Sequence, residues 1–368
     1  MESENIKRFI TCAVPVGACN FHCHYCYLRC HHRGGIADFV LPPAELARRL
    51  SRERLGGACY FNLCGDGETM LHPQLIPLVG RLTQEGHFCD IITNGTVTER
   101  FDELIASLSE VQRERLLIKF SFHWDELNRT GLLDAFAENV SRCRGSGMSC
   151  SVEVTPEDNL IPRIGEIKAY ALERFGALPH ITVARDEGKP DYPLLTALER
   201  EQYGKIWGQF DSEMFRFKLQ YFGKPCKDFC YAGDWSVILD LGTGEYRQCY
   251  AGQRLGNIRD NRPLRFRPIG RCRSPHCHNC HAFLTLGTIP TLQTPSYTQM
   301  RDRVTVNGEH WLNPAGRAFF STRLMERNTL LGPGMRFLIC VRGVPRYMYH
   351  SLRRTVKKGL LHKNVGEG

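Results

Sequence analysis

The stretch "ACNFHCHYCYLRCHH", residues 18–32, contains four cysteines and four histidines, side chains that bind soft metal ions. Three of the thiols, those of Cys19, Cys23 and Cys26, are separated by three and two residues. Iron–sulfur clusters are held by cysteine thiolates, and a 4Fe–4S cluster normally takes four of them. Three ligands on one loop would leave one iron open, whereas a structural zinc ion would need a fourth ligand such as Cys30 or a histidine. The spacing alone leaves both kinds of site as alternatives.

A second group of cysteines lies between residues 226 and 280. Its last two members form the knuckle Cys277-x2-Cys280, and the segment "DWSVILDLGTGEYRQC" before it predicts a β-hairpin. Zinc ribbons are also built on a hairpin and such a knuckle, so zinc and a second iron–sulfur cluster are the two alternatives here. The group consists of Cys226, Cys230, Cys249, Cys272, Cys277 and Cys280.

The elements that must position these cysteines begin at residue 8, where strand-like apolar runs start to alternate with helical patterns. Six strand–helix units in a row predict a parallel sheet, open or curled into a partial barrel. Chemistry in such folds gathers on loops at the carboxyl ends of the strands, and the first cysteine stretch follows the first strand. The expected strands are Phe9–Val14, Tyr60–Cys64, Phe88–Thr93, Leu117–His123, Cys150–Thr155 and His180–Ala184. The expected helices are Pro43–Arg54, Pro73–Glu85, Glu99–Ser107, Thr130–Arg144 and Gly165–Phe175.

Apolar and polar side chains alternate in the fourth and fifth of these strands, within residues 117–123 and 151–155. If the apolar faces pack on helices, the polar faces line an interior that suits a polar ligand. The alternative is that these are ordinary buried polar groups with hydrogen-bond partners. The polar side chains in question are Lys119, Ser121, His123 and Glu153.

Composition is that of an ordinary globular protein, with 42% apolar and 24% charged residues in a chain of 368. The first residues lack the apolar core of a secretory signal, and no apolar run is long enough to span a bilayer. We therefore expect a soluble, cytoplasmic protein. Because the cytosol keeps thiols reduced, the 17 cysteines favour metal binding or burial over disulfides.

The net charge of +9 is concentrated at the carboxyl end. Residues 335–368 contain eight Lys or Arg and one acid, a net charge of +7, so the other 334 residues together carry only +2. Residues 347–358 predict a basic amphipathic helix. Such a helix could dock on its own protein, on an anionic membrane surface at the inner face, or on an acidic partner such as a leader peptide or a phosphorylated glycan carrier. Nucleic acid is not expected, because no recognition module accompanies the charge.

The first cysteine stretch resembles the hallmark of the radical S-adenosylmethionine (radical SAM) enzymes, CxxxCxxC with an aromatic residue, here Tyr25, before the last cysteine. The resemblance implies a partial (β/α)6 barrel and a 4Fe–4S cluster on Cys19, Cys23 and Cys26. It also implies that the open iron chelates S-adenosylmethionine. A reductant such as flavodoxin or ferredoxin would supply an electron that splits this nucleotide into methionine and a 5′-deoxyadenosyl radical, which takes a hydrogen atom from the substrate.

Two further stretches match this family at strand ends. Gly65-Asp66-Gly67-Glu68 stands where the family has its Gly-Gly-Glu motif, which contacts the amino group of the nucleotide, with Asp66 departing from the pattern. Thr93-Asn94-Gly95 follows the third strand, and Ser121 stands where the family often places a ribose contact. The resemblance therefore implies a nucleotide site made by Tyr25, Gly65, Asp66, Gly67, Glu68, Thr93, Asn94 and Ser121.

The second cysteine group resembles the auxiliary-cluster extensions called twitch and SPASM. The cysteine count implies one auxiliary 4Fe–4S cluster, as in twitch domains. The resemblance implies the ligands Cys230, Cys249, Cys277 and Cys280, with Cys226 or Cys272 as a replacement for one of them. Such a closed cluster carries electrons in relatives, which favours a net oxidation or a bond-forming step.

The family resemblance leaves the substrate open. We expect oxidation or epimerisation of a small polar or sugar-like molecule, with His123 and Glu153 as the catalytic proton donor or acceptor. The alternative is a ribosomal-peptide maturase that forms a thioether or carbon–carbon crosslink or epimerises a residue. Because only 18 residues precede the first ligand, its peptide-recognition domain would be a separate protein. A non-enzymatic alternative is a binding module held together by zinc.

Four segments follow from this organisation. Residues 1–185 are expected to form the partial barrel, and residues 186–225 a polar connection with one helical patch. Residues 226–290 would be the auxiliary-cluster domain and residues 291–368 a carboxyl-terminal extension with the basic helix.

Overall fold

A nine-stranded sheet runs through the described part of the chain, and its first six strands are neighbours in sequence order. The computed structural model describes residues 4–26, 28, 34–189, 192–250, 252–272, 274, 277 and 280–341. Strands β1 to β6 all run parallel, so the predicted α/β fold with a parallel sheet is confirmed. These strands are β1 (Arg8–Val14), β2 (Cys59–Gly65), β3 (Phe88–Thr93), β4 (Leu116–Ser121), β5 (Ser149–Val154) and β6 (His180–Ile181).

The first five strands are almost entirely buried, as parallel strands covered on both faces usually are. Their apolar runs predict their bounds to within one or two residues. The sixth strand is shorter than expected, ending at Ile181 rather than Ala184. It lies at one end of the described sheet, where it has a single neighbour.

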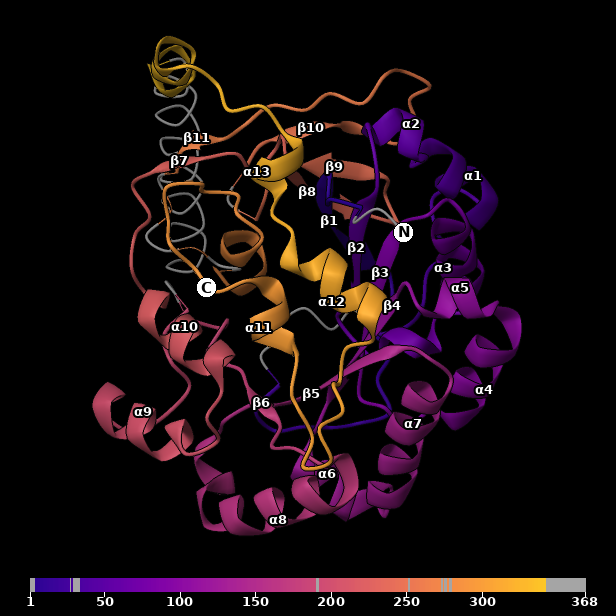
Figure 1. Ribbon diagram of the computed structural model, residues 1–368, viewed down its shortest axis with the longest axis vertical. Helices are drawn as coiled ribbons and strands as arrows, with labels where there is room; N and C mark the ends of the chain where they lie inside the picture. Colours follow the sequence, from indigo (N-terminus) through magenta and orange to yellow (C-terminus); the bar gives the residue numbers. More distant parts are fainter. Residues whose placement is uncertain are drawn as a thin grey trace, which may run out of the picture.

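The helices between these strands cover one face of the sheet, along the right and lower sides of Figure 1, and share a large apolar core with it. The expected helix 43–54 is in fact two helices, because Ser51 ends the first and caps the second by accepting from the Arg54 N–H at 3.4 Å. The expected helix 130–144 begins later, because Gly131 in the left-handed region ends a preceding helix. The helices are α1 (Pro43–Arg49), α2 (Arg52–Leu55), α3 (Leu75–Gln84), α4 (Thr98–Ser107), α5 (Glu110–Arg113), α6 (Trp124–Thr130), α7 (Leu133–Gly145) and α8 (Ile164–Phe175).

The segment expected to be a polar connection contains two helices, α9 (Arg200–Gly208) and α10 (Glu213–Tyr221). Ser212 joins the second of them to the sheet. Its hydroxyl accepts from the N–H of Phe215, at the start of α10, at 3.3 Å and from the N–H of Ile181, in β6, at 3.0 Å. The helix α10 therefore packs beside β6.

The next part of the chain extends the same sheet beyond β1. Strand β8 (Ser236–Asp240) pairs in parallel with β1, and β9 (Glu245–Arg247) pairs antiparallel with β8, which confirms the predicted hairpin. Strand β10 (Arg254–Asn257) pairs antiparallel with β9. A separate antiparallel pair is formed by β7 (Phe229–Cys230) and β11 (Gly270–Arg271).

The carboxyl-terminal helices α11 (Tyr297–Arg301), α12 (Pro314–Ser321) and α13 (Leu324–Arg327) lie across the other, inner face of the sheet, orange to yellow in Figure 1. Phe319 stacks on Phe88 with ring centroids 3.9 Å apart, and Phe320 meets Tyr60 edge-on at 4.8 Å. These partners stand at the starts of β2 and β3, so the segment closes the amino-terminal end of the sheet interior. Burying one such ring is worth about 1.5–3 kcal/mol.

The predicted basic helix 347–358 lies outside the described residues, whereas residues 333–341 are helical. Where the chain is described, no helix is both long and apolar enough to cross a membrane.

Candidate functional site

At the carboxyl ends of the strands the inner face of the sheet is partly exposed, and this exposed region is called the opening below. The last inward-facing side chain of each strand from β1 to β5 is at least partly exposed to solvent, although these strands lie in the middle of the sheet. Two residues earlier on each strand, the inward-facing side chains are buried and largely polar. The accessible set is Ala13, Cys64, Ile92, Ser121 and Glu153, and the buried set is Thr11, Asn62, Asp90, Lys119 and Ser151.

Lys119 belongs to a hydrogen-bonded group below this opening. Its ammonium lies 3.1 Å from the carboxylate of Asp90, which also accepts from the Asn62 amide at 2.5 Å and from the Tyr60 hydroxyl. Burial lowers the pKa of Lys119 to about 8, while Asp90 acts in the opposite direction. Lys119 is therefore an ordinary buried group with a hydrogen-bond partner. This matches the second alternative for the polar strand residues, in which they do not contact a ligand.

Glu153 lies nearer the carboxyl end of its strand, β5, than Lys119 does in β4, and it is held by a residue of α11. Its carboxylate pairs with Arg301, whose guanidinium also donates to the Tyr297 hydroxyl at 3.2 Å. That hydroxyl lies 3.1 Å from the hydroxyl of Tyr60. The Arg301 side chain is 2% exposed and that of Glu153 is 19% exposed, so the carboxylate is the accessible end of a buried chain of polar groups.

The first cysteine loop is joined to the loop after β2 through its backbone. The N–H of Gly67 donates to the carbonyl of Val16, and the N–H of Glu68 donates to that of Ala18, both at 2.8 Å. A Cβ on Gly67 would lie only 2.0 Å from the Ala18 carbonyl oxygen. The two loops can approach this closely only because residue 67 is glycine.

The loop after β3 also contacts the cysteine loop. The Asn94 amide donates to the Asn20 side chain at 2.7 Å, and the Asn20 amide donates to the Thr96 hydroxyl at 2.9 Å. Glu68 links this loop to the previous one, because its carboxylate accepts from the Thr93 hydroxyl at 2.6 Å and from the Asn94 N–H at 2.7 Å. Burial raises the pKa of Glu68, and these hydrogen bonds oppose the rise.

Side chains that follow β4 and β5 complete the ring of contacts. The Tyr25 hydroxyl lies 2.8 Å from Nδ1 of His123, and Nε2 of His24 lies 3.1 Å from the carboxylate of Glu157. Burial lowers the pKa of His123 to about 4. The cysteine loop therefore touches the ends of four successive strands, from β2 to β5.

The three thiols fit the ligand set of an iron–sulfur cluster. Burial raises the pKa of Cys23 to about 12, and the negative charges of Glu126, Cys26 and Cys19 act in the same direction. Cys23 is buried, Cys19 and Cys26 are partly buried, and the N–H of Phe21 donates to Sγ of Cys19 at 3.5 Å. Positive iron would offset the cost of holding thiolates in this mostly buried place.

A single metal ion is a different case. Within the described ranges, no three His, Cys, Asp or Glu side chains come together as ligands of one ion. Cys30, the candidate fourth zinc ligand, lies outside the described residues.

The second cysteine group gathers around β7. Cys230 stands opposite Gly270 in β11, and Cys272 follows that strand directly. Burial raises the pKa of Cys230, and Cys249, Cys272 and Cys226, in that order, raise it further. The structure thus places both alternative ligands beside Cys230. Of the remaining predicted ligands, Cys277 packs on the same apolar cluster as Cys226 and Cys230, and Cys280 begins a π-helical turn.

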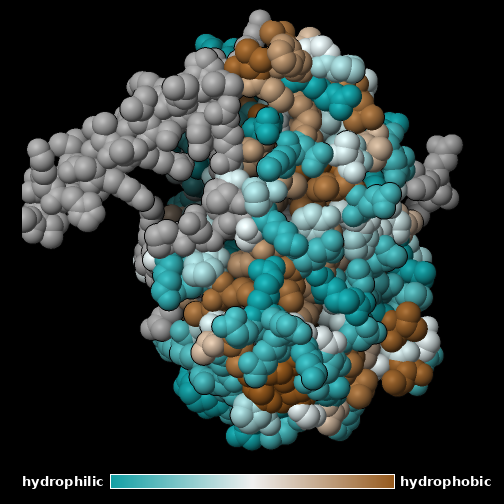
Figure 2. All heavy atoms as spheres, turned by 90° about the vertical axis from the view of Figure 1, so that its left-hand side faces the viewer, coloured by the Kyte–Doolittle hydropathy of each residue, from teal (hydrophilic) through white to brown (hydrophobic). Residues whose placement is uncertain are grey.

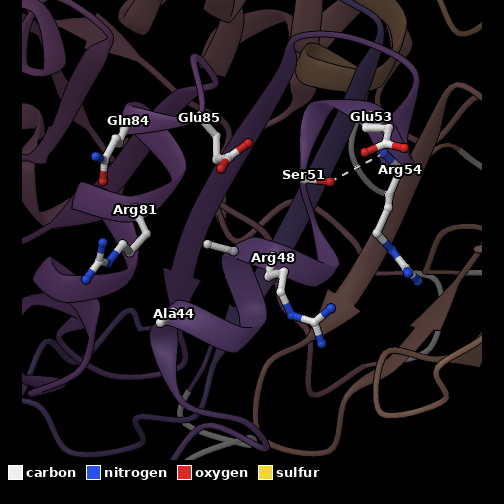
Figure 3. A pocket seen from close by; sticks show the side chains of 9 residues that line it. Ala44, Arg48, Ser51, Glu53, Arg54, Arg81, Gln84 and Glu85 are labelled. Carbon is white, nitrogen blue, oxygen red and sulfur yellow. Dashed lines mark hydrogen bonds between the residues drawn. The ribbon is translucent and has the colours of Figure 1, made fainter.

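A separate hollow of about 760 Å³ opens on the outer helices, among α1, α2 and α3 (Figure 3). It contains none of the predicted site residues. Its lining consists of Ala44, Ala47, Arg48, Ser51, Glu53, Arg54, Arg81, Gln84 and Glu85.

Sequence reasoning missed the residues that hold these groups in place. Arg301 lies 148 positions from Glu153, and nothing local marks it. Asn20 and Glu157 were also missed; both are polar residues on loops that follow strands, which is a weak signal.

The radical SAM superfamily matches residues 14–156 of the chain, a range that includes the first cysteine loop and the ends of β1 to β5. No curated protein matches this sequence. Native anSMEcpe with bound AdoMet is a similar solved structure, with 16% identity, 68% of this chain and 78% of that chain covered, and a TM-score of 0.47. SuiB from Streptococcus suis bound to S-adenosylmethionine has 13% identity and a TM-score of 0.47, with 70% of this chain and 64% of that chain covered. Residues 14–156, which include the cysteine loop and most of the parallel sheet, are therefore similar to the radical SAM superfamily.

Proposed function

We propose that this protein is an enzyme that cleaves S-adenosylmethionine reductively and uses the resulting radical to oxidise or epimerise a small polar or sugar-like substrate. One observation carries the proposal: a single loop carries Cys19, Cys23 and Cys26, of which Cys23 is buried and the other two are partly buried, and hydrogen bonds join this loop to the ends of four strands. Active sites of parallel α/β folds lie at this end of the sheet.

Each part of the chain has its own task in this proposal. Cys19, Cys23 and Cys26 would hold a 4Fe–4S cluster, and Gly67 would let the loop after β2 approach it closely. The nucleotide would lie against the loops 65–68 and 93–94, with Tyr25 and Ser121 at its edges. Glu68 would fix the distance between these two loops rather than act as a free carboxylate, because both its oxygens already accept hydrogen bonds.

A cluster held by these thiolates would supply one electron to the sulfonium, so that methionine would leave and a 5′-deoxyadenosyl radical would take a hydrogen atom from a substrate C–H bond, giving 5′-deoxyadenosine and a substrate radical. In an oxidation the substrate radical loses one electron and one proton. Glu153 is our candidate for the group that accepts the proton, because Arg301 fixes its carboxylate at the opening; His123, bonded to Tyr25, is the second candidate.

The second cysteine group would hold an auxiliary 4Fe–4S cluster that accepts the departing electron. Cys230, Cys249, Cys277 and Cys280 are the proposed ligands, and the nearness of Cys226 and Cys272 to Cys230 keeps both as replacements. Flavodoxin or ferredoxin would be the external reductant.

A peptide substrate is the alternative, in which case the enzyme would form a crosslink or epimerise a residue of a ribosomal peptide. Among the similar solved structures is SuiB bound to the precursor peptide SuiA, with a TM-score of 0.44. The partly exposed polar side chains at the opening, those of Ser121 and Glu153, favour the small polar substrate. An anaerobic assay that counts 5′-deoxyadenosine with and without candidate sugars and peptides decides between them.

Anaerobic reconstitution tests the enzyme class. We expect iron and sulfide to bind and S-adenosylmethionine to be cleaved by the wild-type chain, and Cys23→Ala to abolish the cleavage. Cys12→Ala is the matched control, since Cys12 is equally buried but belongs to neither cysteine group. Tightly bound zinc without iron would instead support a zinc-held binding module.

The auxiliary cluster has its own test. We expect Cys277→Ala to keep uncoupled cleavage of the nucleotide, because the first loop is untouched, but to stop product formation. Full turnover by this variant would rule out the electron-relay role.

A further inference from the structure

The helical residues 333–341 turn an apolar face away from the protein. Met335 is 52% exposed, Phe337 72%, Leu338 38% and Val341 48%. At 100° per residue these four positions share one arc of about 160°, so they form a continuous face. A helix on a globular protein normally turns a polar face outward, whereas this helix leaves these four apolar side chains exposed.

The opposite side of the same helix touches the protein. A Cβ on Gly270, in β11, would lie 3.0 Å from the side chain of Ile339 and 3.6 Å from Sγ of Cys340. The contact fixes which face is turned outward. In Figure 1 the helix stands at the upper left, and Figure 2 shows hydrophobic side chains gathered at the top of that side.

Positive charge accompanies this apolar face. From residue 335 to the end, the chain has eight Lys or Arg and one acid, whereas the rest of the molecule is nearly neutral. An exposed apolar face that is followed in the sequence by many basic residues is typical of helices that lie in a membrane interface. Basic residues are attracted to an anionic lipid surface.

We propose that the helix containing residues 333–341 docks this protein reversibly on an anionic membrane surface. Met335, Phe337, Leu338 and Val341 enter the boundary between headgroups and acyl chains, and the net positive charge of the sequence from residue 335 onward attracts the protein to anionic lipid. The opening at the strand ends lies at the other end of the strands from β7 and β11, so docking leaves it accessible. The inference does not depend on the reaction proposed above.

Co-sedimentation of the full chain with vesicles tests this proposal. We expect binding to phosphatidylcholine vesicles that contain about a third phosphatidylglycerol. Vesicles of pure phosphatidylcholine should bind the protein at least roughly tenfold more weakly. Raising the salt concentration should weaken the binding, since screening removes the charge contribution. The double variant Phe337→Glu/Leu338→Glu should lose roughly tenfold or more of the affinity.

Val306→Glu is the matched control, because Val306 is 75% exposed and lies in another part of the molecule. It should bind vesicles like the wild type, and both variants should keep cleavage of S-adenosylmethionine. Equal binding to neutral and anionic vesicles would overturn the proposal, as would normal binding by the double variant. The proposal would also be overturned if the wild type bound no vesicles but self-associated and the double variant did not. That result would show that a second copy of the chain covers this face.

Discussion

At the scale of single residues, the first cysteine loop depends on neighbours that are not ligands. Its backbone is bonded to Gly67 and Glu68, and its Asn20 side chain to Asn94 and Thr96. These contacts come from loops far apart in the sequence. They set the shape of the loop, and therefore the spacing of the thiols, before any cluster binds.

Gly67→Ala tests this dependence. The added methyl group would lie 2.0 Å from the Ala18 carbonyl, so the loops must separate. We expect a cost of about 1–3 kcal/mol in folding free energy and a large loss of iron after reconstitution. Gly165→Ala, in α8, is the control, because nothing lies within 4 Å of its Cβ, and it should bind iron normally. Normal iron content in Gly67→Ala would contradict this account.

The sequence proposes single residues most readily where their spacing is local. Cys19, Cys23 and Cys26 stand on one loop, and their role as ligands stays a prediction. Arg301 was not, because its partner Glu153 is reached only through the packing of a distant segment. The role of Glu68 as a link between two loops was equally invisible, since it depends on hydrogen bonds to Thr93 and Asn94.

At the scale of elements, the interior of the sheet is held by ion pairs between strands. Asp90 in β3 is fully buried, and its carboxylate lies 3.1 Å from the ammonium of Lys119 in β4. A buried charge without a partner is much more costly than a neutral group of the same size.

Lys119→Met should therefore destabilise the protein by about 3–5 kcal/mol, because it leaves the Asp90 carboxylate unpaired. The double variant Asp90→Asn/Lys119→Met should recover more than half of this loss. Urea unfolding measures both. Arg142→Met, which breaks the exposed pair with Asp102, is the control and should cost less than about 1 kcal/mol. A double variant no more stable than Lys119→Met would contradict the pairing argument.

The bounds of strands and helices could be predicted where they follow from the local sequence pattern. They could not be predicted where tertiary contacts determine them. The bounds of β1 to β5 followed from their apolar runs. The break at Gly131 was missed, although a left-handed glycine ends α6 there. The parallel pairing of β8 with β1 joins residues more than two hundred positions apart, and no local pattern could indicate it.

At the scale of the whole molecule, the sheet separates the two cysteine groups. The first loop follows the carboxyl end of β1, whereas Cys230 and Cys249 pack on the apolar cluster that contains Phe9, at its start. Strand β8, beside β1, is five residues long, or about 16 Å. An electron exchanged between the two proposed clusters would therefore have to cross protein.

The account depends above all on an open iron at the first loop, and electron paramagnetic resonance tests it most directly. The reconstituted protein is reduced without oxygen, and spectra are taken before and after S-adenosylmethionine is added. We predict that the signal of one cluster shifts on addition, and that the shift is absent in Cys23→Ala. A reduced 4Fe–4S signal that the nucleotide leaves unchanged would contradict the central claim.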